Sequence, residues 1–279
     1  MMISRRVLVA AFLSCPFTAR AADNPLAALE REAGGRLGVW VLDTGSGRTL
    51  SHRAHERFAM CSTFKLLAAA CVLKRVDDGR ETLDRQIFVD KTKLVTYSPA
   101  SGKHVGGMMS LEALCDAAVT LSDNTAANLI LETIGGPKAI TALARALGDQ
   151  VTRLDRNEPQ LNDVPRGEVR DTTTPAAMAQ SVRALILSDA LSARSRERLA
   201  GWLVANKTGD KRLRAGLPKD WRIGDKTGTG PRGEANDIAV IWPAGRAPLV
   251  VTAYYQNVHA TAAQRDAVLS EVGRIAAMF

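Results

Sequence analysis

The sequence contains few of the residues that hold metal ions. It has four cysteines and four histidines in 279 residues, and no Cys-x-x-Cys pair. His52 and His55 are the only closely spaced histidines, and no third ligand stands near them. A protein zinc site needs at least three such ligands. We therefore expect neither a metal ion nor another cofactor.

Long apolar runs, internal repeats and low-complexity tracts are also missing from residues 22–279. A membrane-spanning helix needs about 20 consecutive apolar residues, so we expect a soluble chain without a membrane span. A length of 279 residues is at the upper end of what one core supports. We predict one catalytic unit, residues 22–279, with two lobes.

The first twenty-one residues differ in character from the rest of the chain. Arg5 and Arg6 precede an apolar run from Val7 to Leu13, and Ala19-Arg20-Ala21 has the small-x-small form of a cleavage site. Residues 1–21 therefore predict a signal peptide and a periplasmic protein. The twin-arginine route and the Sec route both stay open, and Pro16 after Cys15 argues against lipidation.

Removal of this segment takes three arginines away and lowers the formal net charge from +8 to +5. The remaining cations are scattered among acids, so we expect no nucleic-acid partner. Cys61, Cys71 and Cys115 would remain. An odd number cannot all pair within one chain, so at least one is a free thiol.

Strand-like patterns lie at both chain ends and helical patterns in the middle. This order predicts an α+β fold with one sheet built from both ends and an inserted helical lobe. Residues 152–174 have no periodicity, which favours a functional segment. The expected strands are 36–43, a short one after the turn at 45–47, 238–242 and 249–254; the expected helices are 25–33, 62–76, 110–121, 124–134, 137–147 and 262–278.

Ser62-Thr63-Phe64-Lys65 opens the helix that is apolar nearly all round. The spacing places the hydroxyl and the amine on one face, and the helix dipole favours negative charge at Ser62. Alone the pattern is weak, and a capping serine beside a solvated lysine is the alternative. A lysine opening an apolar helix is better explained as a buried base, since burial lowers its pKa.

Two further motifs carry hydroxyl, amide and amine groups. Ser122-Asp123-Asn124 lies between helical segments and is alternatively an ordinary helix cap. Lys226-Thr227-Gly228 begins the strand-like tail, where a cation and a hydroxyl can bind a carboxylate. Lys207-Thr208-Gly209 has the same letters, but no strand adjoins it in sequence, so we interpret it as a decoy.

These motifs, in this order, are the signature set of class A β-lactamases and penicillin-binding proteins. The chain resembles a class A enzyme from Arg36 to its last helix, and Glu158-Pro159-Gln160-Leu161-Asn162 matches the Glu-x-x-Leu-Asn element of that family's omega loop, here about residues 153–171. Penicillin-binding proteins lack this element. The resemblance therefore favours the β-lactamase over a D,D-peptidase, a sensor domain or a serine glutaminase.

The resemblance implies hydrolysis of penicillins and cephalosporins, and hence β-lactam resistance, through an ester on Ser62. It implies that Glu158 and Asn162 hold the deacylating water, that Lys65 assists proton transfer and that Ser122 protonates the leaving nitrogen. Whether Lys65 or Glu158 is the base in acylation stays open. We expect a monomer whose partners are small β-lactam molecules.

The resemblance also implies a substrate-binding set. Asn124 would bind the side-chain amide, backbone N–H groups of Ser62 and Thr229 would form the oxyanion hole, and Arg212 would replace the arginine that many relatives have at the position of Ala235. The full set is Tyr97, Asn124, Asn162, Arg212, Lys226, Thr227, Gly228 and Thr229.

Three structural details follow from the same resemblance. Arg156 and Asp171 match the ion pair at the neck of the omega loop, and the Glu158–Pro159 bond is expected to be cis. The family's disulfide partners fall at Ala69 and Gly230, so we expect neither of those disulfides to form.

Overall fold

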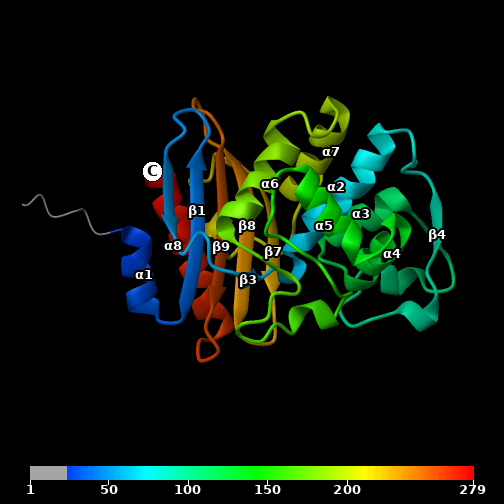
Figure 1. The fold of residues 1–279 in the computed structure, drawn as a ribbon, viewed down its shortest axis with the longest axis horizontal. Helices are drawn as coiled ribbons and strands as arrows, with labels where there is room; N and C mark the ends of the chain where they lie inside the picture. The colour runs from blue at the N-terminus through cyan, green and yellow to red at the C-terminus, as the bar shows by residue number, and fades with distance from the viewer. Residues whose placement is uncertain (1–23) are drawn as a thin grey trace, which may run out of the picture.

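The computed structural model describes residues 24–279, so the expected signal peptide lies outside the described residues (Figure 1). The described chain has a sheet with helices on both of its faces and a helical lobe beside it (Figure 1). The predicted α+β class is confirmed.

An antiparallel five-stranded sheet forms the first lobe, in the order β2-β1-β9-β8-β7. Both chain ends contribute strands, as predicted, because β1 pairs with β9 along its whole length. The bounds are β1 Arg36–Asp43, β2 Thr49–His52, β7 Arg222–Thr229, β8 Glu234–Trp242 and β9 Leu249–Gln256. The strand β7 stands at the edge that faces the helical lobe.

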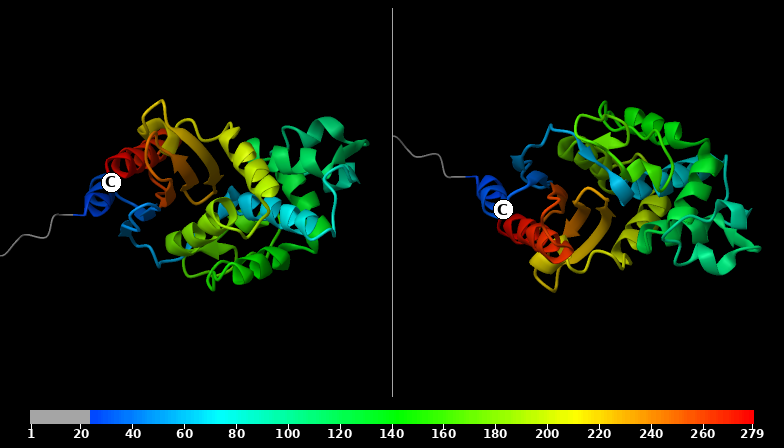
Figure 2. Two further views of the ribbon diagram at one scale, coloured as in Figure 1. Left: turned by 90° about the horizontal axis from the view of Figure 1, so that it is seen from above. Right: turned by 90° about the horizontal axis from the view of Figure 1, so that it is seen from below.

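Helices cover both faces of this sheet (Figure 2). One core lies between the sheet and the terminal helices α1 (Pro25–Ala33) and α8 (Ala262–Met278). The other face packs against α6 (Pro175–Leu187) and the helical lobe. That lobe contains α2 Phe64–Asp77, α3 Leu111–Thr120, α4 Asn124–Ile134, α5 Pro137–Ala146 and α7 Ala193–Val204.

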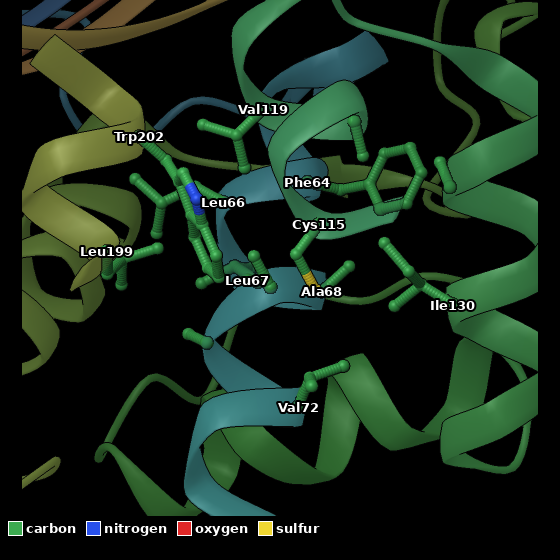
Figure 3. Close-up of a cluster of buried hydrophobic side chains, with 14 of the residues drawn as sticks. Phe64, Leu66, Leu67, Ala68, Val72, Cys115, Val119, Ile130, Leu199 and Trp202 are labelled. Carbon is green, nitrogen blue, oxygen red and sulfur yellow. The ribbon is translucent and has the colours of Figure 1, made fainter. Parts of the chain in front are cut away.

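The helix α2 runs through the centre of the helical lobe (Figure 3). Phe64 and Leu67 are fully buried, and Cys115, Ile130 and Trp202 surround them from α3, α4 and α7. The predicted helix was expected to begin at Ser62. Instead a 3₁₀ turn, η1 (Cys61–Thr63), precedes the α-helix, so Ser62 lies one short turn before the regular hydrogen-bonding pattern begins.

The segment between α5 and α6 has almost no regular structure, as its lack of periodicity predicted. It contains the 3₁₀ turn η4 (Gln160–Asn162) and the two-residue strand β6 (Thr172–Thr173), which pairs with β3 (Phe58–Ala59). The side chain of Thr174 then caps α6 by accepting the N–H of Ala177. The segment is thus anchored at its end while its middle lies against η1.

The remaining elements are short. They are β4 Gln86–Phe88 paired with β5 Met108–Ser110, and the 3₁₀ turns η2 Lys91–Lys93, η3 Ser101–His104 and η5 Leu213–Gly216. Among residues 24–279, no helix combines the length and the apolar character that a bilayer crossing requires.

Candidate active site

Four separate segments bring polar side chains to one place between the two lobes. Ser62 comes from η1, Ser122 from the turn before α4, Glu158 from the segment between α5 and α6, and Lys226 from the edge strand β7. The turn η1 contacts both β7 and η4. The start of the central helix therefore meets the sheet edge and the omega loop directly.

Ser62 lies between an amine and a carboxylate. Its Oγ accepts a hydrogen bond from Lys65 Nζ at 2.9 Å and donates to Glu158 Oε1 at 3.4 Å. Lys65 Nζ is also 3.1 Å from the same carboxylate oxygen, and both side chains are fully buried. The three groups form a closed triangle in which a proton from Ser62 has two nearby acceptor positions.

The surroundings of Lys65 lower the pKa of its amine below the ordinary value. Burial lowers the pKa of the amine, while the Glu158 carboxylate acts in the opposite direction and raises it. The net direction is downward because removal from water penalises the charged form more than one carboxylate compensates. The amine also donates to Ser122 O at 2.7 Å and to Asn124 Oδ1 at 2.6 Å.

Ser122 stands between the two buried lysines. Lys226 Nζ donates to its Oγ at 3.0 Å, and Lys65 Nζ lies 3.5 Å from the same atom. Burial, with the Lys65 charge as the next cause, lowers the pKa of Lys226 to about 7. The Ser122 hydroxyl is therefore positioned to pass a proton between the two sides of the site.

The helix-cap interpretation of Ser122-Asp123-Asn124 is confirmed for Asp123, while the flanking residues present polar groups to the site. Asp123 caps α4, since its side chain accepts the N–H of Ala126, and it also accepts three hydrogen bonds from residues 100 and 101. Asn124 donates one amide proton to Thr96 O at 2.8 Å. An amide NH₂ carries two protons, so one donor of Asn124 remains for another acceptor.

The omega loop is held at its neck by an ion pair. Arg156 Nε lies 2.5 Å from Asp171 Oδ2, whose side chain is fully buried. Asp171 also accepts backbone N–H groups of residues 155 and 156. The Glu158–Pro159 bond is cis, and Asn162 Nδ2 donates to Glu158 Oε2 at 2.5 Å. Both expected details of the loop are confirmed.

A guanidinium lies beside β7, where the sequence placed it. Arg212 Nη2 donates to Thr229 Oγ1 at 2.8 Å, and Nη1 donates to the carbonyl oxygens of Gly228 and Asn236. Its Nε binds Asp266 on α8 at 2.9 Å. Most donors of Arg212 are therefore used within the protein, which fixes the guanidinium next to the Thr229 hydroxyl.

Gly228 is required because β7 approaches the nucleophile turn closely. A Cβ atom there would lie 2.8 Å from Met60 O and 3.2 Å from Cys61 Cβ. The side chain of Asn236 on β8 reaches the same segment and donates to Ala59 O at 2.9 Å and to Met60 O at 3.2 Å. The sequence analysis did not identify Asn236, since no local pattern marks it.

The sequence analysis also missed two other residues that support the site. Asn128 on α4 binds both the N–H and the carbonyl of Glu158, at 2.9 Å each, and thereby fixes the backbone of that residue. Thr208, in the supposed decoy motif, has its Oγ1 2.5 Å from Thr227 Oγ1. The segment 207–209 thus supports the true motif in space, although no strand adjoins it in sequence.

Tyr97 and the thiols complete the predicted set. Tyr97 has positive φ and is 61% exposed, and its carbonyl accepts the N–H of Asn124. Cys61, Cys71 and Cys115 are all free thiols, in agreement with the expectation that neither of the family's disulfides forms. Among the described residues, no cluster of side chains suits a metal ion.

The comparisons with known proteins agree on one family. A sequence model described as the beta-lactamase enzyme family matches residues 21–278. The chain is 48% identical to beta-lactamase CTX-M-8 of Citrobacter amalonaticus over 264 residues, covering 94% of this chain and 91% of that one. It is 47% identical to beta-lactamase L2 of Stenotrophomonas maltophilia over 284 residues, covering 96% and 94%.

The fold gives the same result. A solved structure of an ancestral (GNCA) class A beta-lactamase superposes with a TM-score of 0.90 at 63% identity, covering 91% of this chain and 98% of that one. Sequence motifs, site geometry and overall fold therefore lead to one conclusion: the chain belongs to the class A β-lactamases, serine enzymes that hydrolyse β-lactams.

Proposed function

We propose that Ser62, Lys65, Ser122 and Glu158 catalyse the opening of the β-lactam ring of penicillins and cephalosporins. Ser62 Oγ attacks the lactam carbonyl and passes its proton to the Lys65–Glu158 pair. Its hydrogen bonds to both groups, at 2.9 Å and 3.4 Å, support this step. Ser122, hydrogen-bonded to Lys226, then returns a proton to the departing ring nitrogen.

The negative charge of the tetrahedral intermediate needs donors at a fixed position. We assign this role to the backbone N–H groups of Ser62 and Thr229. Gly228, which lets β7 approach η1, supports the assignment because it brings the two segments together. Ser62 also lies before α2, where the helix dipole favours negative charge.

The substrate carboxylate binds beside β7. Lys226 supplies the nearest cation, Thr227 and Thr229 supply hydroxyl groups, and Arg212 acts through Thr229. Because Arg212 Nη2 already donates to Thr229 Oγ1, the hydroxyl proton of Thr229 is free to be donated to a carboxylate. At the other end of the substrate, away from β7, the second amide proton of Asn124 binds the side-chain carbonyl of the drug. Tyr97 lines the entrance of the active site.

Deacylation separates a β-lactamase from a peptidase that stalls as an ester. Glu158 and Asn162 are joined by a 2.5 Å hydrogen bond, and Glu158 Oε1 is 3.4 Å from Ser62 Oγ. A water molecule between the carboxylate and the ester carbon would be activated by general-base catalysis. This proximity of Glu158 to Ser62 is the single observation on which the proposal depends.

The test is the substitution Glu158→Ala. We expect this variant to form the penicilloyl ester and retain it, because no base remains to activate water, so mass spectrometry detects the mass of the protein plus one penicillin. Steady-state turnover should fall by about two to four orders of magnitude. The variant Ser62→Ala should form no adduct. Glu168→Ala, on the same loop but bound only to neighbouring residues, should behave as wild type. Unchanged turnover in Glu158→Ala contradicts the proposal.

The remaining assignments concern the whole chain. We propose that residues 1–21 are a cleaved signal peptide, that residues 22–279 form one catalytic domain and that the enzyme is a periplasmic monomer. The arginine pair, apolar run and small-residue site of residues 1–21 support the first assignment. The continuous sheet made from both chain ends supports the second.

A further inference from the structure

The segment Lys207-Thr208-Gly209, which repeats the letters of the true motif, lies directly against β7. A Cβ atom on Gly209 would overlap the Asp225 carboxylate on β7, so glycine is required for this approach. Thr208, one residue earlier, has its Oγ1 2.5 Å from Thr227 Oγ1. Two threonine hydroxyl groups therefore meet at the strand that carries the proposed carboxylate site.

The backbone of this segment is fixed independently of the Thr208 side chain. The N–H of Asn206 donates to the Leu203 carbonyl in α7 at 3.2 Å. The N–H of Lys207 donates to the Thr120 carbonyl at the end of α3 at 2.9 Å. A substitution that shortens the Thr208 side chain should therefore leave the backbone of the segment in place.

The side chain of Asn206 determines where the hydroxyl proton of Thr208 points. Its Oδ1 lies 3.0 Å from the backbone N of Thr208 and 2.8 Å from Thr208 Oγ1. A backbone N–H only donates, so the oxygen of the amide, and not its NH₂ group, faces Thr208. The NH₂ group then donates to Asp225 Oδ2 at 2.5 Å. The orientation is the same whether Asp225 is ionised or protonated, because the backbone N–H needs an acceptor in both cases.

The direction of the hydrogen bond between the two threonines follows from this orientation. An amide oxygen accepts and cannot donate, so the single hydroxyl proton of Thr208 points to Asn206 Oδ1. The separation of 2.5 Å between the two hydroxyl oxygens is a hydrogen-bonding distance. Thr227 must therefore be the donor and Thr208 the acceptor. In the enzyme without substrate, the one hydroxyl proton of Thr227 is held by Thr208.

This hydrogen bond has a consequence for the substrate, and the inference rests on the proposed function. An ionised carboxylate only accepts hydrogen bonds. It receives the Thr227 proton only after the hydrogen bond to Thr208 is broken. We propose that Thr208 is a specificity-determining positioning residue that competes with the substrate carboxylate for the hydroxyl proton of Thr227. Its hydroxyl group weakens carboxylate binding, whereas a residue that merely supported the site would strengthen it.

The experiment compares benzylpenicillin with its methyl ester, in which a neutral ester group replaces the carboxylate. The ratio of kcat/KM for the acid to kcat/KM for the ester is measured in wild type and in Thr208→Ala. This ratio does not depend on the fraction of the protein that is folded. In Thr208→Ala the Thr227 proton becomes available, and a hydrogen bond to an ionised acceptor is stronger than one to a neutral acceptor. We therefore expect the ratio to rise by about two- to ten-fold.

Three further variants identify the hydroxyl group as the cause. Thr208→Ser keeps the hydroxyl and should keep the wild-type ratio. In a Thr227→Ala background there is no proton to compete for, so the addition of Thr208→Ala should not change the ratio. Thr44→Ala is the matched control, because Thr44 is a half-buried threonine in the turn after β1 whose hydroxyl donates to Pro248 O at 2.7 Å. This control should also keep the wild-type ratio.

A ratio that is unchanged or lower in Thr208→Ala overturns the inference. An equal rise in Thr208→Ser, in Thr44→Ala or in the Thr227→Ala background does so as well, because the Thr208 hydroxyl would then not be the cause. Failure of the proposed function gives a different result. Wild type would then hydrolyse neither substrate, or it would hydrolyse the acid and the ester equally well, since no group would recognise the carboxylate.

Discussion

Lys226 offers the most quantitative prediction, because its pKa is lowered to near neutral pH. Its side chain extends from β7 and is fully buried, and its Nζ donates to Ser122 Oγ at 3.0 Å and to Thr227 O at 2.9 Å. Burial, with the Lys65 charge as the next cause, lowers its pKa to about 7. The cation that we propose binds the substrate carboxylate is therefore lost as the pH rises through about 7 in the free enzyme.

The magnitude follows from the titration curve. Above the pKa, the protonated fraction falls about ten-fold for each pH unit, which corresponds to about 1.4 kcal/mol of binding energy per unit. Because kcat/KM reports the free enzyme, we expect it to be about 100-fold lower at pH 9 than on its plateau below pH 7. The bound carboxylate raises the pKa of Lys226, so the decline of kcat should begin at a higher pH.

The assay is a pH profile of kcat/KM for benzylpenicillin in wild type and in Lys226→Arg. A guanidinium remains charged throughout this range, so the variant should lose the decline above pH 7, whatever its absolute activity. A wild-type value that changes less than about two-fold between pH 7 and 9 would refute the reasoning. So would an identical decline in Lys226→Arg, because the titrating group would then be another one, such as Lys65.

Two further predictions concern stability, measured as the free energy of unfolding in urea. Arg156→Ala leaves the fully buried Asp171 carboxylate without its guanidinium partner, so we expect the free energy of unfolding to fall by about 3 kcal/mol. A loss below about 0.5 kcal/mol would show that the backbone N–H groups of residues 155 and 156 are sufficient to stabilise the carboxylate. Phe64→Ala empties a fully buried site in the core around α2 and should cost about 3–5 kcal/mol. The control variant Leu94→Ala alters a residue that is 42% exposed and should change stability by less than about 0.5 kcal/mol. Equal effects of Phe64→Ala and Leu94→Ala would contradict this packing.

Local sequence signals were sufficient for most elements. The helices 25–33, 124–134 and 262–278 have the predicted bounds, because cap residues, proline and glycine act within a few positions of a helix end. The predicted bounds of the strands β8 and β9 were less accurate. The strand β8 begins at Glu234 rather than at Ile238, since its polar first half is buried by the site and does not show the apolar run of a core strand.

The start of α2 shows a second limit of local signals. The apolar pattern from Ser62 onward cannot distinguish a 3₁₀ turn from an α-helix over three residues. The close approach of β7 at Gly228 and the hydrogen bonds from Asn236 hold the preceding carbonyl groups of Ala59 and Met60. These contacts come from strands more than 160 residues further along the chain, so tertiary packing determines the geometry at the nucleophile.

The sequence alone thus predicted the candidate catalytic and binding residues, because Ser62, Lys65, Ser122, Glu158 and Lys226 occur in motifs whose spacing is itself informative. Only the tertiary structure decided which other residues support them. Asn128, Thr208 and Asn236 have no local signature, and Arg232 reaches Asp163 only because the β7–β8 register places its turn beside the omega loop. Local patterns encode local conformation, whereas a network of hydrogen bonds and ion pairs depends on how distant strands and helices pack against one another.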